Sequence, residues 1–141
     1  MRRLLITIPV LFTLVMMIYS CQSADQVQKD LYYVSGRDYY IKYCQNCHGA
    51  KGEGLGALAP PLTDTVFLKE NRNKLACFIK NGMSEAITIH GKKYEEKMPD
   101  FQTLGNIDIA KIVVYITNSF GNNQGMYPLE QANEDLKKCK Q

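Results

Sequence analysis

Hydrophobic residues recur at helical spacing along much of the chain. The clearest pattern covers residues 107–120, where they follow the i, i+3, i+4, i+7 rule for one face of a helix. These residues are Ile109, Ile112, Val113, Ile116 and Phe120. Shorter patterns predict helices at residues 35–44, 70–80 and 128–139, with one helical turn at residues 64–68. The sequence therefore predicts an all-α domain with four to five helices.

Three segments depart from the helical pattern. Residues 84–94 contain Ile87-Thr88-Ile89 ahead of Gly91, and this alternation around a glycine predicts a short extended hairpin. Residues 50–59 are rich in glycine and predict a loop with several turns. Residues 22–30 are polar without an apolar period, so they predict a tether ahead of the folded domain.

The N-terminus has the pattern of an export signal. Two arginines precede an apolar stretch, residues 4–18, which is shorter than the ~20 residues that span a bilayer. The stretch ends in Ile18-Tyr19-Ser20-Cys21, which resembles a bacterial lipoprotein signal and implies that Cys21 is acylated as the new N-terminus. An ordinary secretory signal and a retained anchor are the alternatives. All three place the domain outside the cytoplasmic membrane.

These features divide the chain into three parts. We expect residues 1–20 to be removed, residues 21–34 to form the lipidated cysteine and its tether, and residues 35–141 to form the domain, with an extension at 122–141. Loss of the two leader arginines lowers the formal charge of +3 by two, to +1. A nearly neutral domain without a basic stripe argues against nucleic-acid binding.

The strongest chemical signal is Cys44-Gln45-Asn46-Cys47-His48. A Cys-x-x-Cys-His run attaches c-type haem: the two thiols form thioethers, and the histidine binds the iron. Zinc sites and dithiol modules also use Cys-x-x-Cys, but the adjoining histidine and the export signal favour haem. Because the motif occurs once, the sequence predicts one covalently bound haem c.

One histidine leaves the opposite axial position of the iron, for which the sequence offers Met83, His90, Met98 and Met126. Met98 is favoured because Pro99 holds its backbone extended, on a loop that can return across the haem. Methionine is also an established partner for an axial histidine. His90 fits a surface turn better than a ligand position.

Two cysteines are left after lipid and haem are assigned. Cys77 and Cys139 would close a loop of 62 residues, and in an oxidising compartment spare thiols usually pair. The chain-entropy model gives about 4 kcal/mol for such a loop. We therefore expect a disulfide, with two free thiols as the alternative.

From residue 36 to residue 121 the sequence resembles the class I cytochrome c family. The resemblance lies in the haem motif followed by Gly49, then Pro60-Pro61-Leu62, Ile79 to Gly82, Gly91 with Tyr94, and Met98-Pro99 with Phe101 and Leu104. It implies the class I cytochrome c fold around the haem, with a short hairpin before the methionine loop. The two spare cysteines, the tail after residue 121 and the lack of tryptophan near that loop are departures from the family.

The resemblance also implies roles for individual residues. The Pro60 carbonyl would accept a hydrogen bond from the ring of His48, which fixes the imidazole. Met98 would be the second axial ligand. The remaining pocket residues would be Leu62, Ile79, Tyr94 and Leu104.

The family implies one-electron transfer rather than enzymatic catalysis. We expect a carrier in a bacterial respiratory chain, exported to the periplasmic side and lipid-anchored to the cell membrane or outer membrane. Its partners would be a quinol-oxidising complex and a terminal oxidase or reductase. It would act as a monomer or within a complex. The alternatives are a fixed subunit of such a complex and a haem sensor or enzyme with a dissociable methionine.

Overall fold

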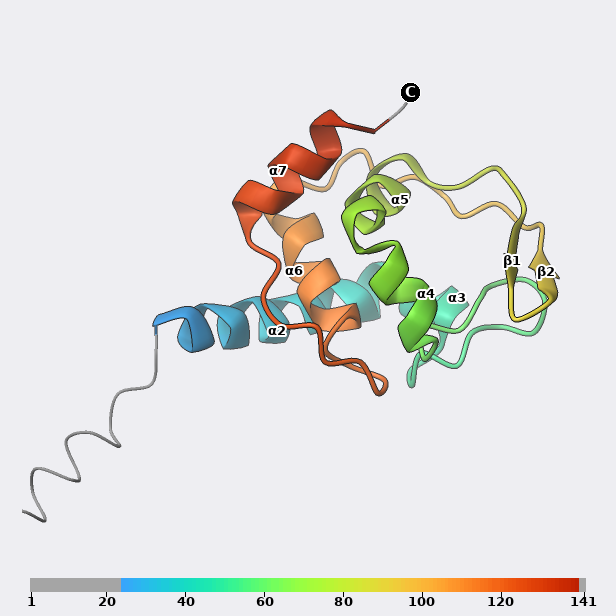
Figure 1. Cartoon of the computed structure of the whole chain (residues 1–141), viewed down its shortest axis with the longest axis horizontal. Coiled ribbons are helices and arrows are strands. Elements are labelled where there is room, and N and C mark those ends of the chain that lie inside the picture. Colours follow the sequence, from blue (N-terminus) through green and yellow to red (C-terminus); the bar gives the residue numbers. More distant parts are fainter. Residues whose placement is uncertain (1–23, 140–141) are drawn as a thin grey trace, which may run out of the picture.

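The computed structural model describes residues 24–139, so the predicted signal peptide and Cys21 lie outside the described residues. Helices dominate this part of the chain, together with one small antiparallel sheet, which confirms the mainly helical prediction at a coarse level. The elements are α2 (Ala24–Tyr43), α3 (Gln45–His48), α4 (Thr65–Glu70), η1 (Arg72–Lys74), α5 (Leu75–Asn81), β1 (Ile87–Ile89), β2 (Lys92–Tyr94), α6 (Asn106–Ile116) and α7 (Leu129–Lys137) (Figure 1).

The most extensive packing between two elements of the domain is that of α2 against α6, and the two helices lie across one another in Figure 1. Gly36 lies at this contact, where any added side chain would meet the Lys111 carbonyl and the Tyr115 side chain. The Tyr40 and Tyr115 rings lie 5.2 Å apart, centroid to centroid, in a tilted arrangement that aromatic pairs favour. A residue without a side chain therefore lets the two backbones approach closely.

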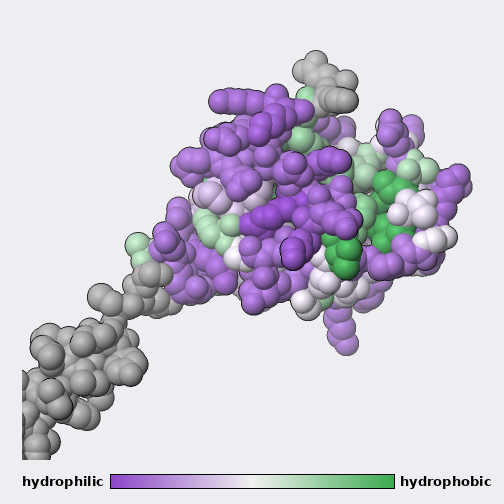
Figure 2. All heavy atoms as spheres, in the orientation of Figure 1, coloured by the Kyte–Doolittle hydropathy of each residue, from purple (hydrophilic) through white to green (hydrophobic). Residues whose placement is uncertain are grey.

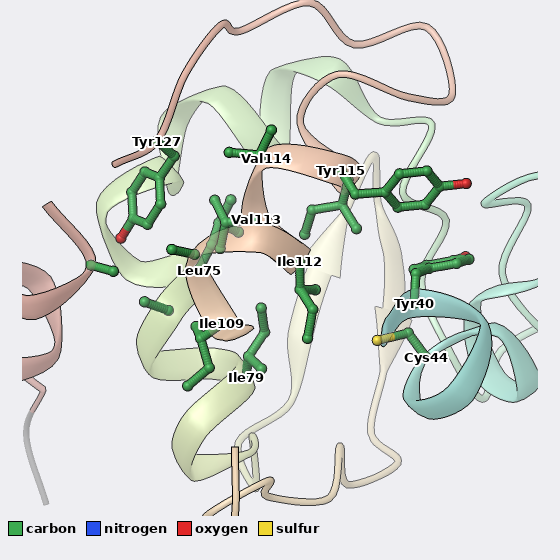
Figure 3. Packing of buried hydrophobic residues seen from close by; sticks show 14 of the residues in the cluster. Tyr40, Cys44, Leu75, Ile79, Ile109, Ile112, Val113, Val114, Tyr115 and Tyr127 are labelled. Atoms are coloured by element: carbon green, nitrogen blue, oxygen red, sulfur yellow. The ribbon is translucent and has the colours of Figure 1, made fainter. Parts of the chain in front are cut away.

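The hydrophobic core is centred on α6. Its residues from Ile109 to Ile116 are buried except Lys111, and Leu75 and Ile79 of α5 pack against them (Figure 3). This matches the apolar period that predicted the helix, because the period marks the face that leaves water.

The C-terminal helix α7 closes one side of this core. Tyr127 is fully buried just before it, and its hydroxyl donates a 2.7 Å hydrogen bond to Asp135. The structure joins Cys77 of α5 to Cys139 by a disulfide, with Cα atoms 5.6 Å apart. The disulfide holds the C-terminal extension against the body of the domain, whereas the Tyr127–Asp135 bond lies within the extension and fixes its own fold.

The predicted hairpin is present as β1 and β2. The strands pair antiparallel, with Ile87 opposite Tyr94 and Ile89 opposite Lys92. His90 and Gly91 form the turn with positive φ angles of 48° and 76°, as a tight two-residue hairpin turn requires. The hairpin lies at the end of the molecule remote from the N-terminal start of α2 (Figure 1).

The described part of the segment expected to be a tether is helical, since α2 begins at Ala24 and includes residues 24–34. Val27, Leu31 and Val34 of this half are 45–64% exposed, and only Tyr32 and Tyr33 are half-buried against the core, so its apolar residues do not form one continuous buried face that periodicity could reveal. Local interactions help to hold it instead: Asp25 lies in the first turn, where the helix dipole favours an acid, and Gln26 donates to Asp30 one turn later at 2.8 Å.

Two other predicted boundaries also differ. The helix expected at residues 70–80 is divided at Asn71, whose φ of −103° and ψ of 15° separate α4 from η1 and α5. The helix expected to reach residue 120 ends at Ile116, and Phe120 takes a positive φ of 58°. Among the described residues, no helix is both long enough and apolar enough to cross a membrane.

Candidate functional site

The candidate haem-attachment residues lie where α2 gives way to α3. Cys44 follows α2 directly, and the backbone N–H groups of Cys47 and His48 both donate to its carbonyl, at 3.1 and 2.9 Å. One helical turn therefore brings Cys44, Cys47 and His48 together on one side of the backbone. Cys44 projects toward the side of α6 that carries Ile112 (Figure 3).

The two thiols have different surroundings. Cys44 is buried, and burial, with a smaller contribution from nearby Cys47, raises the pKa of its thiol to about 12. Cys47 is exposed, and neither cysteine is in a disulfide. The pair therefore offers one thiol inside the domain and one at its surface, three residues apart.

His48 is fixed by a single hydrogen bond. Its Nδ1 lies 2.9 Å from the Pro60 carbonyl, and a carbonyl only accepts, so Nδ1 carries the proton. Burial lowers the pKa of the imidazole, and the bond to Pro60 opposes this shift to a smaller extent. A neutral ring with its proton on Nδ1 leaves the Nε2 lone pair available to a metal.

The loop that carries Pro60 is held in place by backbone bonds. Leu62 N–H donates to the Gly52 carbonyl at 2.8 Å, and Leu55 N–H donates to the Ala59 carbonyl at 3.0 Å. Asn122 adds a side-chain bond to the Leu62 carbonyl at 2.9 Å. These contacts give the Pro60 carbonyl a defined position beside His48.

A largely apolar cavity opens beside these residues, with about 960 Å³ of empty space when its open mouth is included. Eight of the residues expected at the site line it: Cys44, Cys47, His48, Pro60, Leu62, Ile79, Tyr94 and Met98.

Leu104 is the exception among the expected pocket residues. It is buried, at 5% exposure, but it belongs to the core and does not line the cavity. Its carbonyl accepts from the Lys80 ammonium at 2.8 Å, which fastens the segment after the methionine loop to the end of α5. Its contribution is therefore to the packing behind the site.

Several lining residues were not expected at the site. They come from α4, α5 and α6: Leu68, Leu75, Phe78, Ile112 and Ile116. The apolar period of α6 marked Ile112 and Ile116 as buried, but periodicity does not tell a core contact from a cavity wall. Only the position of α3 relative to α6 distinguishes the two.

The structure separates the four candidates for the second axial ligand. Met98 and Met83 both line the cavity, whereas Met126 packs elsewhere against the core. The His90 side chain is 78% exposed and its Nε2 lies 2.8 Å from Asp64, at the turn of the hairpin. The described residues thus bring two methionines, and not His90, to the cavity that contains His48.

The cavity fits a flat, largely apolar metal macrocycle that is bound covalently. Its lining is mainly aliphatic and aromatic, so it would exclude water from such a group. The two thiols lie at its edge for attachment, and His48 and Met98 supply nitrogen and sulfur donors from separate segments of the chain. This set matches the ligands that proteins use for c-type haem iron.

Comparison with known proteins agrees with this geometry. The family described as "Cytochrome C oxidase, cbb3-type, subunit III" matches residues 33–116, more than half of the chain. The chain is also 30% identical over 83 residues to two proteins called cytochrome c-552, both from Thermus thermophilus. The aligned region covers 56% of this chain, and 63% and 56% of the relatives' lengths respectively.

Proposed function

The chain belongs to the cytochrome c family described as cbb3-type oxidase subunit III, and from this premise we propose that it carries single electrons. Members of this family hold a covalently bound haem c with its iron, and their general role is electron transfer. In our proposal Cys44 and Cys47 form the two thioethers, and His48 and Met98 are the axial ligands.

One observation supports this ligand set most directly: the 2.9 Å contact between His48 Nδ1 and the Pro60 carbonyl, inside the cavity that Met98 also lines. The contact fixes the tautomer, points Nε2 away from the backbone and raises the basicity of the ring. Met98 comes from a different segment, after β2, so the two donors are positioned independently. Two ligands already in place need little rearrangement when an electron arrives or leaves.

The bound haem would supply a reversible Fe(II)/Fe(III) couple. The chain's own residues would set the reduction potential of that couple. A thioether from Met98 favours the reduced state compared with a second imidazole. The aliphatic wall formed by Ile79, Ile112 and Ile116 keeps water out and penalises added positive charge. We therefore propose a high reduction potential for a haem protein.

The cellular setting follows from the export signal and the family. We propose that the protein is exported, acylated on Cys21 and held at the outer face of the cytoplasmic membrane or at the outer membrane. It would receive electrons from a quinol-oxidising complex and pass them to a terminal oxidase or reductase. It would not catalyse a reaction itself.

A second candidate is a fixed subunit of a respiratory complex. The family description favours it, because it names a subunit of an oxidase. Both roles need the same haem site, so solubilisation in mild detergent followed by size-exclusion chromatography separates them. A carrier elutes alone, whereas a subunit elutes with partner chains that contain further haems.

Visible spectroscopy tests the ligand set. The oxidised mature protein should show the weak long-wavelength band that arises from sulfur bound to ferric haem iron, and the reduced protein should not change on addition of carbon monoxide. A haem sensor or enzyme with an open or weakly held position would give the opposite result. Such a spectrum would replace the carrier with that alternative.

A further inference from the structure

Met83 lies directly opposite Met98, and the ligand set proposed above does not use it. The two residues exchange both backbone hydrogen bonds: each N–H donates to the other's carbonyl at 3.0 Å. In such an antiparallel pair the two side chains point to the same face, with Cβ atoms roughly 4.5–5.5 Å apart. One short ribbon therefore presents two thioethers on one side.

That side faces the cavity. Met83 and Met98 both line it, and both are partly buried. Methionine has three rotatable bonds and a polarizable sulfur, so a small change of side-chain conformation moves the sulfur over a distance comparable with the spacing of the pair. A second soft donor of the same chemistry is thus available from the same wall.

The backbone keeps Met83 in place independently of the Met98 side chain. The bridge uses only main-chain atoms, and Gly82, with a φ of 69°, leaves room for the Met98 carbonyl where any other residue would place its Cβ. Removal of the Met98 sulfur would leave these contacts intact. Met83 would then still point into the cavity next to the vacated position.

We propose that Met83 is a reserve axial ligand, which binds the iron when Met98 is displaced and keeps the sixth position closed to small molecules. This inference rests on the proposed His48–Met98 ligation. Lys97, Glu85 and Glu96 also line the cavity, but each is exposed to water and a charged head is better solvated there. A thioether has the softness that haem iron accepts beside histidine.

Methionine-methyl NMR of the reduced mature holoprotein tests the proposal directly. Of the six methionines in the sequence, removal of residues 1–20 leaves three, at positions 83, 98 and 126, so three methyl signals are expected. The ring current of the haem shifts the methyl group of a bound methionine far upfield. The parent should show one such signal, kept in Met83→Leu and Met126→Leu and lost in Met98→Leu.

The NMR spectrum of the Met98→Leu variant decides whether Met83 binds the iron. We expect it to show a new upfield methyl at a different chemical shift, which persists in Met98→Leu/Met126→Leu and is absent from Met98→Leu/Met83→Leu. Leucine conserves volume, so folding is expected to survive, and covalent haem with unchanged far-UV circular dichroism verifies this in each variant.

Carbon monoxide titration gives a second, independent readout. Binding to Met98→Leu should be about tenfold weaker than binding to the double variant Met98→Leu/Met83→Leu, because an internal ligand that occupies most sites lowers apparent affinity in proportion. Equal carbon monoxide affinities of the single and double variants would overturn the reserve role of Met83. A Met98→Leu spectrum without an upfield methyl signal would also overturn it, including the case in which Lys97 binds the iron instead. A parent without an upfield methyl would instead contradict the His48–Met98 ligation itself.

Discussion

The Pro60 carbonyl and the Tyr127 hydroxyl show how single buried polar groups are satisfied in this domain. Pro60 accepts from His48 at 2.9 Å, and Tyr127 donates to Asp135 at 2.7 Å. Asp135 is only 4% exposed, so the hydroxyl supplies one of the few donors available to its carboxylate. A buried acceptor that loses its donor costs about 1–3 kcal/mol.

Tyr127→Phe should therefore lower the free energy of unfolding by about 1–3 kcal/mol at neutral pH. Burial raises the pKa of Tyr127 above its ordinary value of 10.0, and the bond to Asp135 raises it further. An acid whose pKa is higher in the folded state stabilises that state fully below its unfolded pKa, and the contribution falls as pH rises above 10. The difference in the free energy of unfolding between parent and variant should therefore shrink above pH 10.

Urea unfolding of the two proteins between pH 7 and pH 11 measures this difference. Tyr39→Phe is a useful control. The Tyr39 hydroxyl also donates a hydrogen bond to a carboxylate, that of Asp108, but the Tyr39 side chain is not fully buried. A parent–variant difference for Tyr127 that stays constant with pH would contradict the assigned role of the hydroxyl.

At the scale of residues, the candidate site residues that fixed spacing defines are those that the structure brings together at the cavity. Cys44, Cys47 and His48 lie within five positions, and Pro60 follows His48 by twelve residues. The identification of these four residues therefore does not depend on how the rest of the chain packs. Leu104 was misplaced and Met83 was left among several candidates because both positions depend on how the loop after α5 folds back. No local pattern in the sequence records that return.

At the scale of elements, the loop that carries Met98 is set by its contact with the end of α5. Gly82 has a φ of 69°, and an added side chain would meet the Met98 carbonyl and the Asp100 backbone N–H group. The residue thus serves both the turn after α5 and the close approach of the methionine loop. Lys80 binds the far side of the same loop through the carbonyls of Gln102 and Leu104.

Gly82→Ala should destabilise the fold by about 1–3 kcal/mol through the left-handed backbone alone. The clash with the Met98 carbonyl should in addition loosen the loop and make part of the reduced protein reactive to carbon monoxide. Gly91→Ala is the matched control, because its φ is 76° and nothing lies within 4 Å of an added Cβ. Equal carbon monoxide reactivity in the two variants would contradict this account of the loop.

The contact between α2 and α6 gives a prediction in which two effects oppose each other. Helix propensity alone makes Gly36→Ala stabilising by about 1 kcal/mol. The added methyl would meet the Lys111 carbonyl and Tyr115, and overpacking costs about 1–3 kcal/mol. We expect net destabilisation in thermal unfolding, and Asp38→Ala on the exposed face of α2 should have little effect. A more stable Gly36→Ala protein would show that the helices are not closely packed there.

Element types were easier to predict than their limits. The apolar face of α6 and the alternation of the hairpin both reflect burial, which the sequence records. The start of α2 and the break at Asn71 are not recorded in this way, because α2 is exposed over its first two turns and Asn71 lies in an otherwise helical pattern.

For the molecule as a whole, the link between Cys77 and Cys139 should determine how firmly the C-terminal extension is held. A closed loop of 62 residues is worth about 4 kcal/mol in the chain-entropy model. Cys77→Ser/Cys139→Ser should therefore lower Tm markedly while the visible spectrum stays that of the parent, since neither sulfur lines the cavity. Unchanged Tm, or free thiols in the parent by mass spectrometry, would contradict the link.

Apolar side chains are exposed on the surface beside the candidate haem site. Figure 2 shows hydrophilic residues over most of the visible face, with hydrophobic ones gathered toward the end of the molecule that carries the hairpin. Leu55 and Leu58 in the loop before Pro60 are 49% and 55% exposed, and Leu58 lines the cavity. Exposed apolar side chains therefore lie beside the candidate haem site.

A redox titration of the mature protein, run once under nitrogen and once under carbon monoxide, tests whether the haem transfers single electrons with both axial positions filled. A one-electron carrier with both axial positions filled should titrate reversibly with a slope of about 59 mV per tenfold change in the oxidised-to-reduced ratio. Its midpoint should be the same under the two gases. A midpoint that rises under carbon monoxide would show an open ferrous site, and the protein would then be a ligand-binding haem protein rather than an electron carrier.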